Sequence, residues 1–260
     1  MSFSIAVAGK GGNGKTSVSA LIIRYLIKSG RGPVLAVDAD PNANLGESLG
    51  LEVKETVGLM LDTFQKAKID IPAGMTKEAY LEFKLNSLLV ESRHLDLLTM
   101  GRGEGQDCYC YPNLILRKFI DRLADNYAFI VMDNEAGMEH LSRGTTQDID
   151  ELLIVSNHSI KGVRTISRIK KLVSELKLRV KHASVLINMA PSQLDQQITA
   201  ELERLGLTAD AIIPQDEEIY QFDLKMRPLL DLPETSTSVS AINVFMAKIL
   251  DQAMAGTHKI

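Results

Sequence analysis

The chain of 260 residues contains no tryptophan, only two cysteines and few aromatic residues, which make up 5% of the composition. Two cysteines separated by one residue do not build the disulfide framework of a secreted domain, so we expect a reduced, cytoplasmic protein. No apolar run approaches the roughly 18 residues that span a bilayer, and the N-terminus lacks the basic region of a signal peptide. The sequence therefore predicts no membrane partner.

A surplus of basic charge is also missing, because 29 Lys and Arg stand against 33 Asp and Glu, for a formal net charge of −4. Surfaces that bind nucleic acid without sequence preference are expected to be basic, so we expect no nucleic-acid partner. A chain of this length can bury about three quarters of its unfolded surface as one domain. No linker, repeat or low-complexity segment divides residues 1–260, and we predict a single domain.

Short apolar runs alternate with helical patterns along the chain. We predict strands at 3–8, 33–38, 95–100, 128–133, 151–156, 183–188 and 209–213. We predict helices at 16–29, 112–125, 160–178, 192–205 and 240–254. This βαβ succession indicates an α/β fold with a doubly wound, mostly parallel sheet, helices on both faces and ligands at the carboxyl ends of the strands. Residues 52–94 are the hardest part to interpret; we expect helices there, broken at Pro72-Ala73-Gly74.

The first predicted strand runs into the sequence Gly9-Lys10-Gly11-Gly12-Asn13-Gly14-Lys15-Thr16, which fits the phosphate-loop pattern G-x-x-x-x-G-K-[ST]. Strand, glycine-rich turn and helix form the context that this motif requires. The backbone N–H groups and the helix N-terminus would face a polyphosphate. Lys15 would neutralise phosphate charge, and Thr16 would complete a Mg²⁺ shell. The predicted nucleotide contacts are Gly11, Gly12, Asn13, Gly14, Lys15, Thr16 and Ser17.

Three aspartates follow predicted strands, where they would approach this loop. Asp38 and Asp40 are two residues apart on an extended segment, so they point the same way; one can hold a Mg²⁺-bound water while the other orients the attacking water. The alternative is that they only turn the loop before Pro41. Asp133 ends another strand, as the acid that contacts Mg²⁺ through water does. Gly137 would let the backbone approach the γ-phosphate and move when it leaves.

Two further strand ends carry residues that suit a nucleobase. Asn188 offers both a donor and an acceptor, which match the edge of adenine, and Pro214-Gln215-Asp216 follows the next strand. The alternative is ordinary turn chemistry. The guanine-specific pattern N-K-x-D is absent after Asn188, so ATP is favoured over GTP. We therefore predict that Asn188, Pro214 and Asp216 bind the nucleotide.

The two cysteines lie in Asp107-Cys108-Tyr109-Cys110, where both sulfurs can meet one soft metal ion. Two thiolates fill half of a four-ligand site. The other ligands would be water, His94, Glu104, Asp107 or a second copy of the loop, and a symmetric dimer would supply the last directly. The alternative is a pair of reduced cysteines packed under a loop. Sulfur ligands suit Zn²⁺, Ni²⁺, Cu⁺ or iron–sulfur chemistry.

The motif K-G-G-x-G-K-T at residues 10–16 resembles the deviant Walker A motif of the family that contains nitrogenase iron protein, MinD, ParA and the arsenite-pump ATPase. That resemblance implies an ATPase in which Lys10 reaches across a homodimer to the partner's nucleotide and acts with Lys15. It also implies that Asp40 activates the attacking water, that Asp38 lies near Mg²⁺, and that Asn188 and the Pro214 loop enclose the base.

The same motif together with D-A-D-P-x-x-N-L, C-x-C and D-N-E-A-G-M-E-H-L-S-R is similar to the CooC and AcsF type of maturation ATPase, which serves nickel-dependent carbon monoxide dehydrogenase and acetyl-CoA synthase. This similarity implies an ATP- and Mg²⁺-dependent homodimer that binds Ni²⁺, with Zn²⁺ possible, through Cys108 and Cys110 of each subunit. It implies delivery of nickel to an apo-enzyme and does not separate the two clients.

Two other functions remain as alternatives. A spatial regulator of the MinD or ParA type would use a membrane or DNA, and the segment Val239 to Ala253 has the helical spacing of a membrane anchor. This segment carries one Lys and no basic face, so we predict instead a last helix packed on the sheet. An iron–sulfur carrier ATPase is the second alternative, although no cysteine follows Asp133 and no C-x-x-C lies near the C-terminus.

Overall fold

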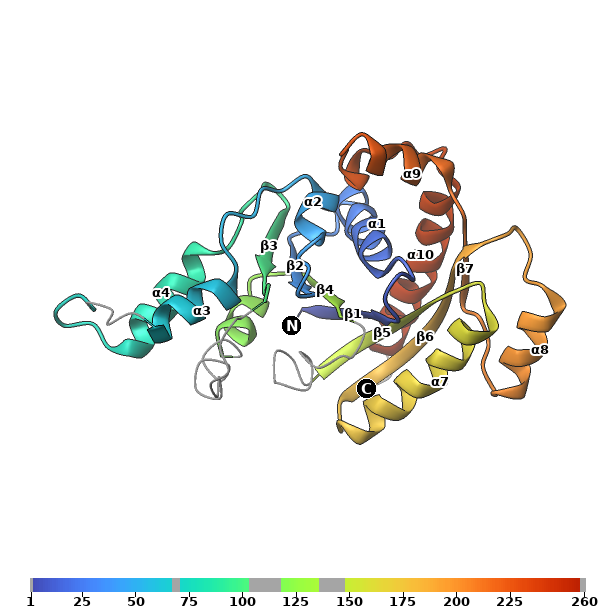
Figure 1. Cartoon of the computed structure of the whole chain (residues 1–260), viewed down its shortest axis with the longest axis horizontal. Helices are drawn as coiled ribbons and strands as arrows, with labels where there is room; N and C mark the ends of the chain where they lie inside the picture. The colour runs from blue at the N-terminus through green and yellow to red at the C-terminus, as the bar shows by residue number, and fades with distance from the viewer. Residues whose placement is uncertain (1, 67–70, 103–117, 136–147, 258–260) are drawn as a thin grey trace.

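The computed structural model describes residues 2–66, 71–102, 118–135 and 148–257. Its centre is a seven-stranded sheet in the order β3-β2-β4-β1-β5-β6-β7 (Figure 1), in which every pair of neighbouring strands is parallel. The strands are β1 (Phe3–Gly9), β2 (Val34–Ala39), β3 (Leu95–Thr99), β4 (Phe129–Asn134), β5 (Asp148–Asn157), β6 (Arg179–Ala190) and β7 (Ala211–Pro214). The predicted doubly wound sheet is confirmed.

Helices cover both faces of the sheet. One face carries α1 (Lys15–Lys28), α2 (Leu45–Leu49), α9 (Glu217–Leu224), the 3-10 helix η1 (Leu229–Asp231) and α10 (Thr237–Thr257). The other carries α3 (Val57–Lys66), α4 (Lys77–Ser87), a helical stretch at 118–124, α7 (Ile160–Glu175) and α8 (Gln196–Arg204). Successive side chains of β1 supply both cores, because Ile5 and Val7 pack on the first face and Ala6 and Ala8 on the second.

The last helix behaves as predicted from its sequence. Val239, Ile242 and Phe245 of α10 are buried in the same core as α1. Among the described residues, no helix is long and apolar enough to cross a bilayer. The amphipathic pattern of residues 239–253 is therefore explained by packing within the domain.

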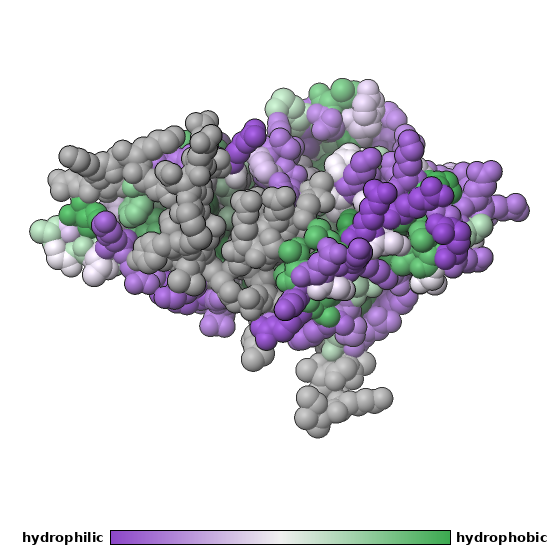
Figure 2. Space-filling model, turned by 60° about the horizontal axis from the view of Figure 1, so that its bottom comes forward, coloured by the Kyte–Doolittle hydropathy of each residue, from purple (hydrophilic) through white to green (hydrophobic). Residues whose placement is uncertain are grey.

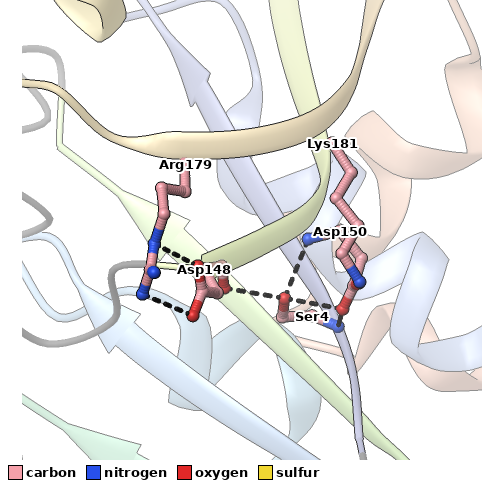
Figure 3. Close-up of polar contacts among 5 residues, drawn as sticks. All are labelled: Ser4, Asp148, Asp150, Arg179 and Lys181. Atoms are coloured by element: carbon pink, nitrogen blue, oxygen red, sulfur yellow. Dashed lines mark hydrogen bonds and ion pairs between the residues drawn. The ribbon is translucent and has the colours of Figure 1, made fainter.

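Strands β5 and β6 begin earlier than the sequence predicted, at Asp148 instead of 151 and at Arg179 instead of 183. Charged residues at the start of both strands interrupt the apolar runs from which the strands were predicted. In the structure the charges pair across the two strands: Arg179 Nε lies 2.6 Å from Asp148 Oδ1, and Lys181 Nζ lies 2.6 Å from Asp150 Oδ1 (Figure 3). Ser4 of β1 joins them, donating its hydroxyl to Asp150 Oδ2 at 3.0 Å.

The region that was hard to interpret contains helices, as expected, with a turn at Ala73 and Gly74. Figure 1 shows α3 and α4 extending beyond β3 at the edge of the sheet. Ion pairs of Glu78 with Lys118 and of Glu82 with Arg122 fasten α4 to the helical stretch at 118–124. The short helices α2 and α9 were not predicted, since their five and eight residues are fewer than the roughly 11 over which apolar periodicity can be recognised. Residues 112–117 of the predicted helix 112–125 lie outside the described residues.

Candidate nucleotide-binding site

The phosphate loop connects β1 to α1 and lies against the end of β5. A Cβ atom at Gly9 would come within 2.3 Å of the Val155 carbonyl oxygen, so only glycine allows this approach. Gly12 and Gly14 have φ values of 80° and 77°, a backbone region that favours glycine. The N-cap of α1 is Gly14, which offers no side chain to the first-turn N–H groups. These groups are free to bind an anion at the positive end of the helix.

Two asparagines hold the loop in this shape. Asn13, which is 3% exposed, donates its Nδ2 to the Val155 carbonyl oxygen at 3.1 Å. Asn188, at the end of β6, donates its Nδ2 to the Asn13 carbonyl oxygen at 2.9 Å. Asn188 therefore contacts the phosphate loop and uses one of its two amide N–H groups there. Its Oδ1 is an acceptor suited to the amino group of adenine, and contact with a base stays a prediction.

The predicted Mg²⁺ ligands meet on the α1 face of the sheet. Thr16 Oγ1 donates to Asp133 Oδ2 at 2.6 Å, and Ser19 Oγ lies 3.3 Å from Asp133 Oδ1. Asp38 and Asp133 are register partners on the adjacent strands β2 and β4. Sequence reasoning missed Ser19, although it lies one helical turn after Thr16 and so faces the same way. Hydroxyl and carboxylate oxygens are the ligands that Mg²⁺ prefers, and the residues present fit this ion.

Both buried carboxylates have raised pKa values. Burial, with a smaller effect of the neighbouring Asp38, raises the pKa of Asp133 to about 7 despite the hydrogen bond from Thr16. Burial likewise raises the pKa of Asp38 to about 6, against backbone hydrogen bonds from Leu45 and Asp40. A divalent cation beside these groups would reverse the shifts, because it favours their charged forms. Without a cation, the negative charges of Asp38 and Asp133 therefore destabilise the folded protein.

The raised pKa of Asp133 predicts that the free energy of unfolding depends on pH, and Asp133→Asn should remove this dependence. Between the ordinary pKa of 3.8 and about 7 the folded chain binds more protons than the unfolded chain, so its free energy of unfolding falls as pH rises through that window. At pH 8 and without nucleotide, Asp133→Asn should raise the melting temperature by about 3 °C or more. The same variant should lose the extra stabilisation that Mg²⁺ adds to ATP.

Thermal melts at pH 5 and pH 8 measure both effects. The control is Asp125→Asn, because Asp125 is exposed and its carboxylate makes no hydrogen bond or ion pair with another described residue, so the melting temperature should not change. A variant at Asp133 that melts below the parent protein at pH 8 would contradict the assigned cost.

Asp38 and Asp40 do different work in the loop after β2. Asp38 is fully buried and accepts hydrogen bonds from the backbone N–H groups of Leu45 and Asp40, at 2.9 and 3.1 Å. Asp40 is partly exposed, and its Oδ1 accepts from the backbone N and the Nδ2 of Asn42, both at 2.9 Å. Asp38 therefore holds the loop beside the predicted Mg²⁺ site, while Asp40 Oδ2 accepts no hydrogen bond from another described residue.

A cleft of ≈ 870 Å³ opens beside the first turn of α1, large enough for the nucleoside half of ATP. Its walls include Thr16, Ser17, Asn188, Met189, Pro214, Asp216, Tyr220, Met226 and Arg227. The residues from α9 were not expected from the sequence. Asp216 lines this cleft, but its carboxylate accepts hydrogen bonds from Ser236 Oγ at 2.6 Å and from the N–H groups of Glu218 and Ser238. It joins the N-termini of α9 and α10 and so shapes the wall; direct contact with a nucleotide stays a prediction.

Three predicted site residues, Gly137, Cys108 and Cys110, lie outside the described residues, as do Glu104 and Asp107. Among the described residues, no three His, Cys, Asp or Glu side chains gather as a metal site. His94 precedes β3 at the amino end of that strand, roughly 13 Å of strand from the end at which the chain continues toward the cysteines. A role of His94 as a ligand of that metal stays a prediction. Lys10 is exposed, and no ion pair joins it to another described residue.

A parallel sheet with a phosphate loop at the carboxyl end of its central strand defines a P-loop nucleotide-binding protein. Comparison with known proteins identifies the family. Residues 4–229 match the model of the CobQ/CobB/MinD/ParA nucleotide binding domain. The chain belongs to this family of ATP-binding P-loop ATPases, whose Walker A motif is the deviant form.

Relatives span from two thirds to nearly all of the chain. An uncharacterized ATP-binding protein of Methanocaldococcus jannaschii is 43% identical over 250 residues, covering 95% of this chain and 98% of the relative. The carbon monoxide dehydrogenase accessory protein CooC of Rhodospirillum rubrum is 29% identical over 186 residues, covering 67% and 70%.

Solved structures show the same fold. A ParA family ATPase from Chlorobium tepidum has a TM-score of 0.72 at 21% identity, covering 95% of this chain and 98% of that one. MinD of Pyrococcus horikoshii, complexed with Mg-ADP, has a TM-score of 0.67 at 22% identity over the full length of both chains.

Proposed function

We propose that this protein is an ATPase that loads nickel into an apo-enzyme, carbon monoxide dehydrogenase or acetyl-CoA synthase. ATP and Mg²⁺ bind in the cradle of the phosphate loop, with Asp38 and Asp133 holding the cation and Asp40 orienting the attacking water. Nickel is the cargo, held by Cys108 and Cys110 of two subunits. The similarity to CooC and the C-x-C sequence support this proposal.

The observation that carries the proposal is where the cysteine segment begins. Met100, just after β3, donates its N–H to the carbonyl oxygen of Asp38 at 2.8 Å. The chain thus departs toward Cys108 and Cys110 from a backbone that is bonded to the predicted Mg²⁺ site. A change in the loop after β2 during hydrolysis would act on the start of this segment, which couples nucleotide state to metal affinity. Such coupling is reciprocal, so nickel would also alter ATP affinity.

Dimerisation completes both sites in this proposal. Lys10 is exposed at the mouth of the phosphate loop, where its amine is available to a second subunit. Two C-x-C segments related by a two-fold axis would supply four thiolates to one ion. Mass measurement with and without ATP tests this point. A chain that stays monomeric with Mg²⁺ and ATP would refute the shared metal site.

Replacing both cysteines by alanine should weaken Ni²⁺ binding by about 100-fold or more while leaving ATP affinity unchanged. Equilibrium dialysis with Ni²⁺ and a separate ATP titration measure the two properties. Lys15→Ala is the complementary variant, because it keeps both cysteines. It should lose ATP binding, and ATP should no longer change its affinity for Ni²⁺. Nickel affinity that is unchanged in the double cysteine variant would refute the cargo assignment.

A further inference from the structure

The net charge of −4 conceals a strong asymmetry. Residues 160–182, which hold α7 and the start of β6, contain eight Lys or Arg and one Glu, a net charge of +7. The rest of the chain therefore carries −11. Hydrophilic residues predominate over the right-hand part of Figure 2, where α7 and α8 lie, interrupted by small hydrophobic areas. This positive region stands out in an otherwise acidic protein.

Four of these basic residues form one row on α7. Lys161, Arg164, Arg168 and Lys171 follow the spacing i, i+3, i+7 and i+10, which places them on one face of a helix over roughly 15 Å. All four are exposed. The opposite face of α7, with Val163, Ile166 and Ile169, is buried in the core. We call the row of four the α7 stripe.

Ion pairs neutralise two of the four residues of the α7 stripe. Arg164 pairs with Glu201 of α8 at 2.6 Å, and Lys171 lies 3.6 Å from Glu175. No ion pair joins Lys161 or Arg168 to another residue in the part of the chain that the structure describes. Exposed cations without partners add little to the stability of the fold, so stability does not explain the stripe.

We propose that the α7 stripe binds an acidic surface of a partner protein. Charge complementarity of this kind steers association and selects partners. Leu172 of α7 and its C-cap residue Leu176 are partly exposed, which suits the mixed apolar and polar composition of protein interfaces. This inference goes beyond the proposed nickel function and does not depend on it.

Other polyanions suit the stripe less well. No aromatic residue lies between 160 and 182, so single-stranded nucleic acid has no side chain on which to stack. Duplex DNA would be repelled by the rest of the chain, whose formal net charge is −11. No large hydrophobic residue of α7 is among the exposed ones, so the helix lacks the apolar face that inserts into a lipid surface.

The helix that carries the stripe is linked to the phosphate loop through the end of β5. A Cβ atom at Gly162 would come within 2.4 Å of Asn157 Oδ1 and 2.5 Å of Ser156 Oγ, so the first turn of α7 packs directly on the end of β5. Two residues before Asn157, the Val155 carbonyl oxygen accepts a hydrogen bond from the Asn13 side chain of the loop. A partner on the stripe would therefore bind a helix that packs on the strand contacted by the phosphate loop.

The test compares two double charge reversals in the full-length protein. K161E/R168E breaks no ion pair in the described part of the chain, so the variant should fold normally, which its melting curve checks. K54E/K248E changes the charge equally at exposed positions off α7. The probes are a fluorescent helical peptide with glutamates on one face, its glutamine analogue, a duplex DNA of equal charge and phosphatidylglycerol vesicles.

At low ionic strength the glutamate peptide should bind more tightly than the other three probes. K161E/R168E should weaken that binding by about tenfold or more, whereas K54E/K248E should change it by less than about twofold. Equal losses in the two variants, tighter binding of DNA or vesicles than of the peptide, or no binding of the peptide would each overturn the proposal. Nickel and ATP affinities are measured separately, so failure here leaves the proposed function untouched.

Discussion

Asp40→Asn should lower the rate of ATP hydrolysis by about 10²- to 10⁴-fold and leave ATP affinity nearly unchanged. The range is that of a lost general base. Asp40 is not needed to hold the phosphate loop, since its hydrogen bonds lie within its own turn, with Asp38, Asn42 and Ala43. Binding and hydrolysis should therefore separate in this variant.

The asparagine is chosen because it preserves the turn. Asp40 Oδ1 accepts two hydrogen bonds from Asn42, and the carbonyl oxygen of an asparagine accepts the same two. What is lost is the negative charge and, with the second carboxylate oxygen, the capacity to take a proton from water. Phosphate release under single turnover, with ATP affinity measured by titration, gives the two quantities.

Asn42→Ala is the matched control, because it removes one hydrogen bond from Asp40 and leaves the carboxylate. It should change hydrolysis by no more than about tenfold. If Asp40→Asn hydrolysed ATP at the rate of the parent protein, Asp40 would not be the base. A combined loss of binding and hydrolysis would instead assign Asp40 to the nucleotide cradle.

Gly9→Ala is the substitution with the largest expected effect on stability. Its Cβ atom would lie 2.3 Å from the Val155 carbonyl oxygen, a backbone atom that cannot rotate away. Strands β1 and β5 must separate at their carboxyl ends, which disturbs the Asn13 contact with the same oxygen. We expect a loss of about 3 kcal/mol in the free energy of unfolding and a large loss of ATP affinity.

Gly11→Ala, two residues further on, is the control for stability. A Cβ atom there has no other atom within 4 Å. Denaturant unfolding without nucleotide should show a change of less than about 0.5 kcal/mol for Gly11→Ala. If the two variants unfold alike, then close packing against β5 is not the reason for glycine at position 9.

Much of the site could be predicted because each of its segments follows a strand. Glycines, Lys15 and Thr16 after one apolar run, and Asp38 and Asp133 after two others, imply a shared edge once the strands are assumed parallel. Ser19 and the cleft wall from α9 were missed, since their role depends on neighbours far along the chain. The length of β5 was underestimated because Asp148 and Asp150 look like loop residues until Arg179 and Lys181 lie beside them.

Sequence alone determined the features that act over a few residues: alternating apolar runs, the glycines that a phosphate loop needs, and one row of basic residues along a helix. Only the tertiary structure decided which distant groups meet, such as Thr16 with Asp133 and Asn13 with Asn188. Local steric constraints and periodicity depend on neighbouring residues, whereas the order of the strands depends on how the crossover helices pack on both faces of the sheet. That packing brings residues 117 and 175 positions apart into hydrogen-bonding distance.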